Sequence, residues 1–301
     1  MAQSTAGSIL GIVAPFTGAT SLIAGTPGSV PAPTAGDEAK FLLGGGAWTT
    51  PPSFTGATAV TAGATGFVPA PAAGDNAKLL CGNGTFSTAL VGTRLLTSGT
   101  SYTPTSGTNK IICWVVGGGG GGGLVASSIS TLTGGGGGSS GVVGFLEDVS
   151  DTVAYAYSIG AGGLSSGNGT STTITVNGNT YTGLFGSAGV DGTANAPSVT
   201  AGGGGGGTVP ASASGNAFYC ANGSQGGTGF SVASNNHSSG AGGSNMFGIG
   251  GGSRVRTTAG SNAGVAGDGF GGGGSGSIQN NSAAQAAGAG SGGCIICFEY
   301  R

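Results

Sequence analysis

Seven consecutive glycines, Gly117–Gly123, directly follow the bulky apolar residues WVV at 114–116. Further glycine runs lie at 202–207, 250–252 and 271–274, with polar inserts between them. Fixing one backbone costs roughly 1–2 kcal/mol and glycine loses the most freedom, so seven ordered glycines cost on the order of ten kcal/mol. Glycine has no side chain to bury. These runs therefore limit the possible folds more than any other feature.

Two interpretations of the runs are open, a flexible linker or an ordered core made of backbone. Phe218, Phe230 and Phe270 interrupt the region, and a solvated linker would avoid such residues. The mean hydropathy of +0.23 is also opposite to that of disordered chains. Without Cβ atoms, polyglycine II helices approach closely and exchange backbone hydrogen bonds. We therefore expect a thin, rigid slab of packed polyglycine helices with polar inserts projecting at its ends.

Charge and hydropathy narrow the classes of function. The 301-residue chain has a net charge of −2 and only 5% charged residues, so no basic surface is available for a nucleic acid or an anionic membrane. No apolar run approaches the ~18 residues of a transmembrane helix. The short apolar patch near the N-terminus has no basic residue before it, which favours mature protein over a signal peptide.

The cysteines do not form a disulfide framework, because five are scattered over the chain. Cys294 and Cys297 have CxxC spacing, but no second such pair exists and His237 is the single histidine. The flanking sequence GGCIICFEYR alternates like a strand, in which residues three apart point to opposite faces. We interpret these cysteines as buried reduced thiols rather than as metal ligands.

An internal repeat fills residues 16–88, after an N-terminal segment at 1–15. FTGATSLIAGTPGSVPAPTAGDEAKFLLGGGAWTT begins at Phe16, and FTGATAVTAGATGFVPAPAAGDNAKLLCGNGTFST begins at Phe54. VPAP favours extended backbone, whereas GGGAW and GNGTF are typical of hairpin turns before an aromatic strand residue. Two such units cannot bury a core alone, so they are predicted to need partner copies.

Residues 89–109 are predicted to be a polar connection to a glycine-rich domain at 110–301. This domain opens with KIICWVV (110–116) and closes with CIICFEY (294–300), and such similar ends predict that the two strands pair. Four further strands are predicted, at 141–146, 152–159, 172–176 and 179–185. The fold class is therefore mainly β, with a small sheet plus packed polyglycine segments.

Both halves of the chain resemble bacteriophage tail-fibre proteins. GFVPAPAAGDNAKLLCGNGTF at 66–86 is similar to the fibre repeat GLVPAPAAGDxxKFLxGDGTW, and the copy at 28–48 matches more loosely. The second half resembles the glycine-rich C-terminal domain of these fibres, in which an apolar strand enters a glycine block and a strand such as CIICFEY closes the domain. The polyglycine sandwich of certain phage adhesins is similar in principle, without a strict motif match.

The resemblance implies an elongated, homotrimeric virion fibre, assembled in the host cytoplasm. The repeats would form its stalk, with the N-terminus attached to other tail or capsid proteins, and the glycine-rich domain its distal head. A host surface glycan or outer-membrane protein would be the ligand, with no nucleic acid and no cofactor. The alternative is a purely structural capsid or tail decoration fibre. A third hypothesis, an ice-binding or silk-like protein, gives the 38-residue repeat no role.

The sequence offers few residues that could carry out catalysis. His237 lies in the polar stretch ASNNHSSG, which is typical of a solvated loop rather than of a catalytic base. Glu147, Asp148 and Asp151 form a carboxylate cluster, but LEDVSDT is typical of a turn between strands. The glycine runs lack the Lys-Ser/Thr of phosphate-binding loops. We expect no enzyme activity and no catalytic or metal-ligating residues.

Binding chemistry is better supplied, in the inserts between the glycine runs. Aromatic faces beside amide groups suit sugars or protein loops, and loops on a rigid scaffold are common recognition sites. The alternative for the aromatic residues is packing against the slab, and for the arginines a solubilising role. The receptor-binding candidates are Phe218, Tyr219, Asn222, Gln225, Asn235, Asn236, His237, Arg254 and Arg256.

Overall fold

The computed structural model describes most of the chain and divides it into two compact units, residues 1–88 and 89–301. The described residues are 24, 31–43, 46–50, 55–58, 60–64, 68–75, 78–82, 84–87, 90–125, 132–192, 200–201, 203–206, 216–232, 236–280 and 282–301. All regular elements in these ranges are strands, so the mainly β prediction is confirmed, and no described segment is a helix that could cross a membrane. The predicted N-terminal segment at 1–15 lies outside the described residues.

Each repeat of the first unit contains one small hairpin. β1 (Phe41–Leu42) pairs with β2 (Trp48–Thr49), and β3 (Leu79–Leu80) pairs with β4 (Phe86–Ser87). As the sequence predicted, the glycine-rich turns lead into an aromatic strand residue. Gly46 has a φ of +82°, a left-handed conformation that glycine adopts without strain.

An aspartate fixes the turn that precedes each hairpin. Asp37 accepts hydrogen bonds from the Thr34 amide and hydroxyl and pairs with Lys40 at 2.5 Å. The hydrogen bond from Lys40 and those from Thr34 lower the pKa of Asp37 to about 2. Asp75 pairs with Lys78 at 2.6 Å in the second repeat. Apart from Asp37, the buried side chains described in this unit belong to Pro33 and Pro71, which agrees with the expectation that the repeats lack an apolar core.

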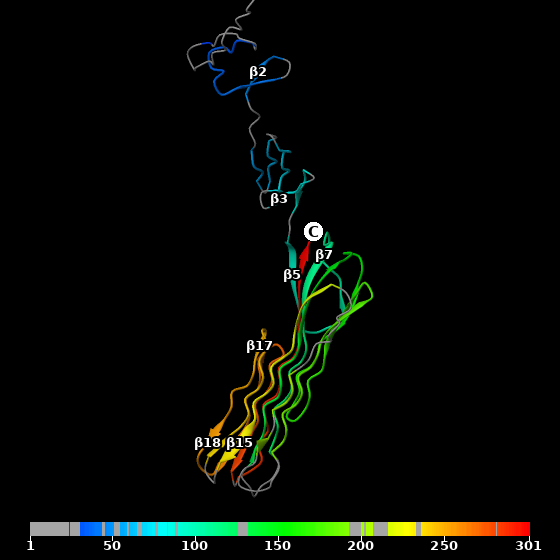
Figure 1. Ribbon diagram of the computed structural model, residues 1–301. Helices are drawn as coiled ribbons and strands as arrows, with labels where there is room; N and C mark the ends of the chain where they lie inside the picture. The colour runs from blue at the N-terminus through cyan, green and yellow to red at the C-terminus, as the bar shows by residue number, and fades with distance from the viewer. Residues whose placement is uncertain are drawn as a thin grey trace, which may run out of the picture. The chain divides into compact units, whose positions relative to one another are not determined.

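A β-sandwich forms one end of the second unit (Figure 1). Its larger sheet has the strand order β14-β9-β7-β22-β5 and is antiparallel throughout. The central pair is KIICWVV against CIICFEY, as their similarity predicted. The strands are β5 (Leu90–Leu96), β7 (Lys110–Val116), β9 (Val142–Asp148), β14 (Ala217–Ala221) and β22 (Cys294–Tyr300).

A second, four-stranded sheet covers one face of the first. Its order is β12-β11-β10-β6, with β6 (Ser101–Tyr102), β10 (Tyr155–Ser158), β11 (Thr172–Val176) and β12 (Asn179–Gly183). Residues 89–109, expected to be a connection, therefore contain β5 and β6 of the two sandwich sheets. Side chains of both sheets form one buried cluster, in which Phe145 stacks on Tyr181 with ring centroids 3.8 Å apart.

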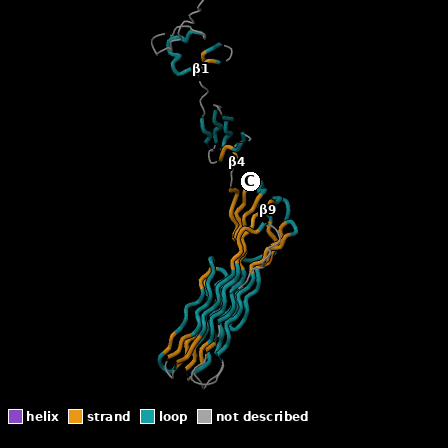
Figure 2. The backbone as a smooth tube through the Cα atoms, in the orientation of Figure 1, coloured by secondary structure: helices purple, strands orange, loops and turns teal. Residues whose placement is uncertain are grey.

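The glycine runs form an ordered slab that extends from the sandwich (Figure 2). Along residues 117–123, every third amide donates to the same neighbouring segment. One series of donors bonds to residues 135–141, the second to 167–170 and the third to 288–291, with N···O distances of 2.8–3.3 Å. A three-residue repeat is that of the polyproline II conformation, so the run is a polyglycine II helix.

Three further segments donate to the carbonyl groups of this run. They are residues 163–166, 186–189 and 274–277, so six described segments surround the central helix. The segments 134–141 and 271–277 are surrounded in a similar way, and every residue in all three is buried. This is the backbone core that the sequence analysis favoured over a flexible linker.

The backbones of neighbouring segments lie so close together that glycine is the residue that fits along 117–123. A Cβ atom built on any residue of 117–123 would lie 1.8–2.5 Å from a backbone atom of a neighbouring segment. At Gly121 the distance to the Leu164 carbonyl oxygen would be 1.8 Å. Real Cβ contacts are never this short, and the clashing atom is backbone rather than a movable side chain.

Short strands close the end of the slab that is remote from the sandwich (Figures 1 and 2). One sheet has the order β13-β15-β16-β18 and is named the tip sheet here. Its strands are β13 (Thr200–Ala201), β15 (Gly229–Val232), β16 (Asn236–Ser238) and β18 (Val255–Arg256). A three-stranded sheet beside it contains β8 (Leu132–Thr133), β19 (Gly260–Asn262) and β21 (Ile278–Asn280). β17 (Gly248–Ile249) and β20 (Asp268–Gly269), which are separated in the chain by β18 and β19, form a two-stranded antiparallel pair.

Candidate functional site

The tip sheet presents an apolar outward face. Phe230 is opposite Ser238, which is opposite Val255 on the next strand, and Val232 is opposite Asn236. Residues opposite each other in neighbouring strands lie on the same face of a sheet. Phe230, Val232 and Val255 are 48%, 58% and 66% exposed, so this face combines an aromatic ring, two aliphatic side chains and an exposed amide.

The opposite face of the tip sheet is turned inward and holds the sheet in place. His237 is 1% exposed, and its Nδ1 lies 2.7 Å from the Ser231 hydroxyl. The prediction of a solvated loop histidine is therefore wrong, because alternation along β16 turns its ring into the tip. His237 is therefore not available on the outward face, whereas Asn236 beside it is exposed there.

The two arginine candidates have different surroundings. Arg256 is in register with His237, and its guanidinium donates to the carbonyl oxygens of Thr258 and Ala259 and to the Asn262 side chain. It therefore closes the turn between β18 and β19. Arg254 is exposed, and its amide donates to the Ser239 hydroxyl, so its side chain stands at the margin of the tip sheet.

Phe218 and Tyr219 lie far from the tip in the fold. The structure places them in β14, an edge strand of the sandwich, instead of in an insert at the end of the slab. Both rings contact Trp114 edge to face, with centroids 5.5 and 5.1 Å apart. The alternative prediction was that these aromatic residues pack against the slab. They do pack against the protein, but the surface they contact belongs to the sandwich. They remain 55% and 37% exposed.

The remaining candidates are not brought together by the fold. Asn222 and Gln225 are exposed and lie between β14 and β15, Gln225 within a glycine segment of the slab. Asn235 lies outside the described residues. Sequence reasoning missed Phe230, Val232 and Val255 as site residues. The alternation of GFSV was the signal available for Phe230 and Val232, but four residues beside a glycine segment make a weak strand pattern.

The acidic residues are dispersed by the fold. Glu147 accepts hydrogen bonds from the Tyr181 hydroxyl and the Asn179 side chain, Asp148 pairs with Lys110, and Asp151 accepts from the Gly107 amide. Glu147 and Asp148 belong to β9, so the expected turn begins only after them. No group of three His, Cys, Asp or Glu in the described ranges is arranged to hold a metal ion.

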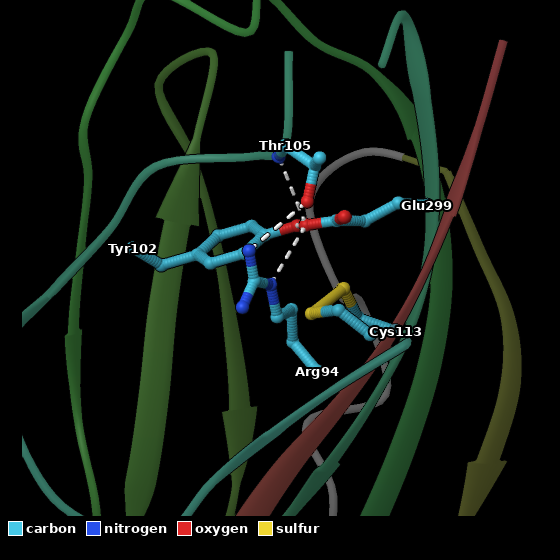
Figure 3. Close-up of a disulfide and its surroundings, with 6 residues drawn as sticks. Arg94, Tyr102, Thr105, Cys113 and Glu299 are labelled. Atoms are coloured by element: carbon cyan, nitrogen blue, oxygen red, sulfur yellow. Dashed lines mark hydrogen bonds and ion pairs between the residues drawn. A yellow bond between two sulfur atoms is a disulfide. The ribbon is translucent and has the colours of Figure 1, made fainter. Parts of the chain in front are cut away.

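The sandwich core holds a second buried carboxylate next to a disulfide (Figure 3). Glu299 is fully buried, and one of its oxygens accepts hydrogen bonds from the Tyr102 hydroxyl at 2.8 Å and the Thr105 amide at 3.2 Å. Burial, and then the hydrogen bond to Glu299, raise the pKa of Tyr102 well above its usual value. The half-exposed Arg94 side chain pairs with the same oxygen at 3.7 Å, so the carboxylate is held by residues of three strands and of the segment that follows β6.

The expectation of reduced thiols is wrong for Cys297. Cys297 is in register with Cys113 in the central strand pair, and the two form a disulfide across the sheet. Cys294 is buried and free on the opposite face of β22, as the alternation predicted. Burial raises the pKa of its thiol to about 12. CxxC spacing along one strand separates the two sulfur atoms and rules out a bond between these two cysteines.

Comparison with known protein families places the sandwich, slab and tip in one unit. A family model described as a glycine-rich domain matches residues 95–300, from the end of β5 to the end of β22. The comparison with curated proteins found no match. The matched region covers more than half of the chain and contains both the backbone core and the strands that enclose it. The chain therefore belongs to the glycine-rich domain family.

Proposed function

We propose that this chain is a bacteriophage virion fibre protein that binds the host cell surface through the outward face of the tip sheet. The observation that carries the proposal is the cluster of Phe230, Val232 and Val255, exposed together at one end of an ordered slab. Exposed apolar residues gathered on one face are typical of interaction sites. A single exposed apolar side chain is common on protein surfaces and would not indicate an interaction site.

The slab suits this role because it positions the tip without contributing side chains to it. Its helices are hydrogen-bonded on every side in the interior, so the tip strands are anchored to a rigid base. Recognition residues are commonly placed on segments that a rigid scaffold positions. A ligand therefore meets a preformed surface and little binding energy is lost in ordering it.

The assignment to a phage virion is supported by the resemblance of residues 66–86 to the repeats of tail-fibre proteins. In this proposal the repeats form a homotrimeric stalk, since the described part of that unit buries little more than Pro33, Asp37 and Pro71. The N-terminus attaches to other virion proteins, and the tip sheet contacts an outer-membrane protein or a surface glycan.

The test is adsorption of virions that carry the double substitution Phe230→Ser and Val255→Ser. Both side chains point outward, so the fold should be retained while adsorption to host cells falls. Each lost contact is worth about 1 kcal/mol, and several fibres per virion multiply that loss. Val153→Ser is the matched control, because Val153 is 45% exposed in the sandwich and far from the tip sheet.

Normal adsorption of the double variant would contradict receptor binding by the tip sheet. The structural role of a capsid or tail decoration fibre would then be the better explanation, and particles lacking the protein would still adsorb. A loss of adsorption in the Val153→Ser control would show that the assay responds to surface changes in general.

A further inference from the structure

The larger sheet of the sandwich has an apolar outer face, on the side opposite to the disulfide. Leu95, Ile296 and Trp114 follow one another across β5, β22 and β7 as register partners. A second row contains Phe298, Ile112 and Leu146 across β22, β7 and β9. An antiparallel sheet with one solvated face normally carries polar side chains there. This face departs from that rule.

A β-bulge concentrates aromatic residues at one side of the outer face. The register of β14 against β9 shifts between Ala217 and Tyr219, so the consecutive residues Phe218 and Tyr219 both contact Trp114. Gly144 makes room for them, since a Cβ there would lie 3.0 Å from both the Phe218 and Trp114 rings. The bulge and the glycine together build an aromatic surface that the sandwich core does not need.

The chain covers only the part of this face nearest the slab. Phe247 and Phe270 pack there over Cys294, Val116 and Val142. Among the described residues, nothing covers the remainder, where Leu95 and Phe218 are each 55% exposed. The charged side chains on this face are Lys110 and Asp148, which pair at 3.5 Å at the far end of β7 and β9. An apolar centre with a charged margin is the usual anatomy of a protein interface.

We propose that the outer face is the contact surface between copies of this chain. Five strands about 4.8 Å apart and seven residues of about 3.4 Å each span roughly 24 by 24 Å, an area of about 580 Å², which lies at the small end of the range for specific interfaces rather than at the ~800 Å² per partner of a standard one. β5 pairs with β22 alone among the described strands, so its other edge is also open to a second copy.

A second copy is favoured over a foreign ligand by the path of the chain. The first unit ends at Thr88, and β5 begins at Leu90, so copies associated through their repeats bring their β5 strands together. This step rests on the proposed function, in which the repeats form a trimeric stalk. Phe218 and Tyr219 then contribute to assembly rather than to receptor binding.

Hydroxyl-radical footprinting of the purified full-length chain tests the interface, because no other protein is present, and the Leu95→Glu variant separates protection by a second copy from shielding within one chain. Phe218 and Phe230 are 55% and 48% exposed in one chain, so they form a matched pair of the same residue type. We expect Phe218 to be oxidised several-fold more slowly than Phe230. Leu95→Glu should raise the rate at Phe218 to that of Phe230, whereas Val153→Glu, the control, should leave the difference intact.

Equal rates at Phe218 and Phe230 in an oligomeric wild type would overturn the interface and leave the tip sheet as the proposed receptor site. A wild type that light scattering shows to be monomeric would overturn the interface together with the trimeric stalk. Neither equal oxidation rates nor a monomeric wild type tests receptor binding. That proposal is tested separately by the adsorption of virions with Phe230→Ser and Val255→Ser. Slow oxidation of Phe218 that Leu95→Glu does not relieve would also contradict the proposal, because local shielding within one chain would then explain it.

Discussion

The sandwich and the slab of the second unit are two cores of opposite chemistry. In the sandwich, Ile111, Phe145 and Tyr181 fill the space between two sheets, and the identity of each side chain matters. In the slab the interior is backbone, and the requirement at Gly117–Gly123 is that no side chain be present. Side-chain burial stabilises the first region, and hydrogen bonds together with close packing stabilise the second.

This difference separates two ways in which a sequence specifies a structure. A sandwich core tolerates exchange among apolar residues of similar volume. The run Gly117–Gly123 leaves no room for a side chain at any position, whereas the other two interior segments also hold fully buried serines at 139, 140, 275 and 277. The two regions should therefore respond to different perturbations, and the following experiments test that separation.

The largest effect is expected for Gly121→Ala, which adds one methyl group to the slab interior. The new Cβ would lie 1.8 Å from the Leu164 carbonyl oxygen, so neighbouring helices must separate and lose hydrogen bonds. We expect a loss of more than about 3 kcal/mol, the upper range for overpacked cores, and rapid hydrogen exchange of the slab amides. Gly252→Ala is the control, because nothing lies within 4 Å of its added methyl group and no loss is expected. Equal stability of the two variants would refute the backbone core.

Removal of the disulfide should affect both regions, although both cysteines belong to the sandwich. Cys113 and Cys297 are 184 residues apart, and the closed loop contains the whole slab. We expect Cys113→Ala with Cys297→Ala to lower the free energy of unfolding by about 3–5 kcal/mol, measured by denaturant titration. Cys220→Ser changes an exposed free thiol and should be neutral. If the double variant loses protection from amide hydrogen exchange in the sandwich but not in the slab, the two regions unfold separately.

A smaller effect is expected from trimming the sandwich core. Ile111 is fully buried, whereas Ile112 is half-buried on the outer face. Ile111→Val should cost about 0.5–1.5 kcal/mol, measured by thermal unfolding, and Ile112→Val clearly less. The reverse order would mean that the outer face is packed more tightly than the interior.

The smallest effect concerns alkaline pH, to which the sandwich should respond and the slab should not. All six tyrosines lie in sandwich strands, and burial together with the hydrogen bond to Glu147 raises the pKa of Tyr181 to about 12. A raised pKa stabilises the fold fully below pH 10, and this contribution is lost as the pH rises toward 12. The difference in unfolding free energy between wild type and Tyr181→Phe should therefore shrink over this range. A constant difference would contradict the shifted pKa.

Much of the fold could be predicted from the sequence, because the signals are local or terminal. The similarity of KIICWVV and CIICFEY predicted the central strand pair, and the lack of side chains in the runs predicted a backbone core. The sequence did not show which face of that pair is buried, and the pleat turns Ile111 and not Ile112 into the core.

The misses share a physical cause, which is pairing between segments far apart in sequence. The partner of Cys297 depends on the register of β22 against β7, and spacing along the chain carries no information on it. The burial of His237 depends on three-residue strands that form only because the slab places them together. The bulge at Ala217 and Tyr219 likewise has no local signature in the sequence.

The three-residue period of the slab sets a rule for insertions and deletions. In the run 117–123, amides three residues apart donate to one neighbour and intervening amides to others. One added glycine would turn every following residue by a third of a revolution and direct its amide to the wrong helix. Three added glycines would keep each donor facing its acceptor. Changes of length within the buried helices should therefore be inherited in steps of nine nucleotides, while the turns at the slab ends are free of this constraint.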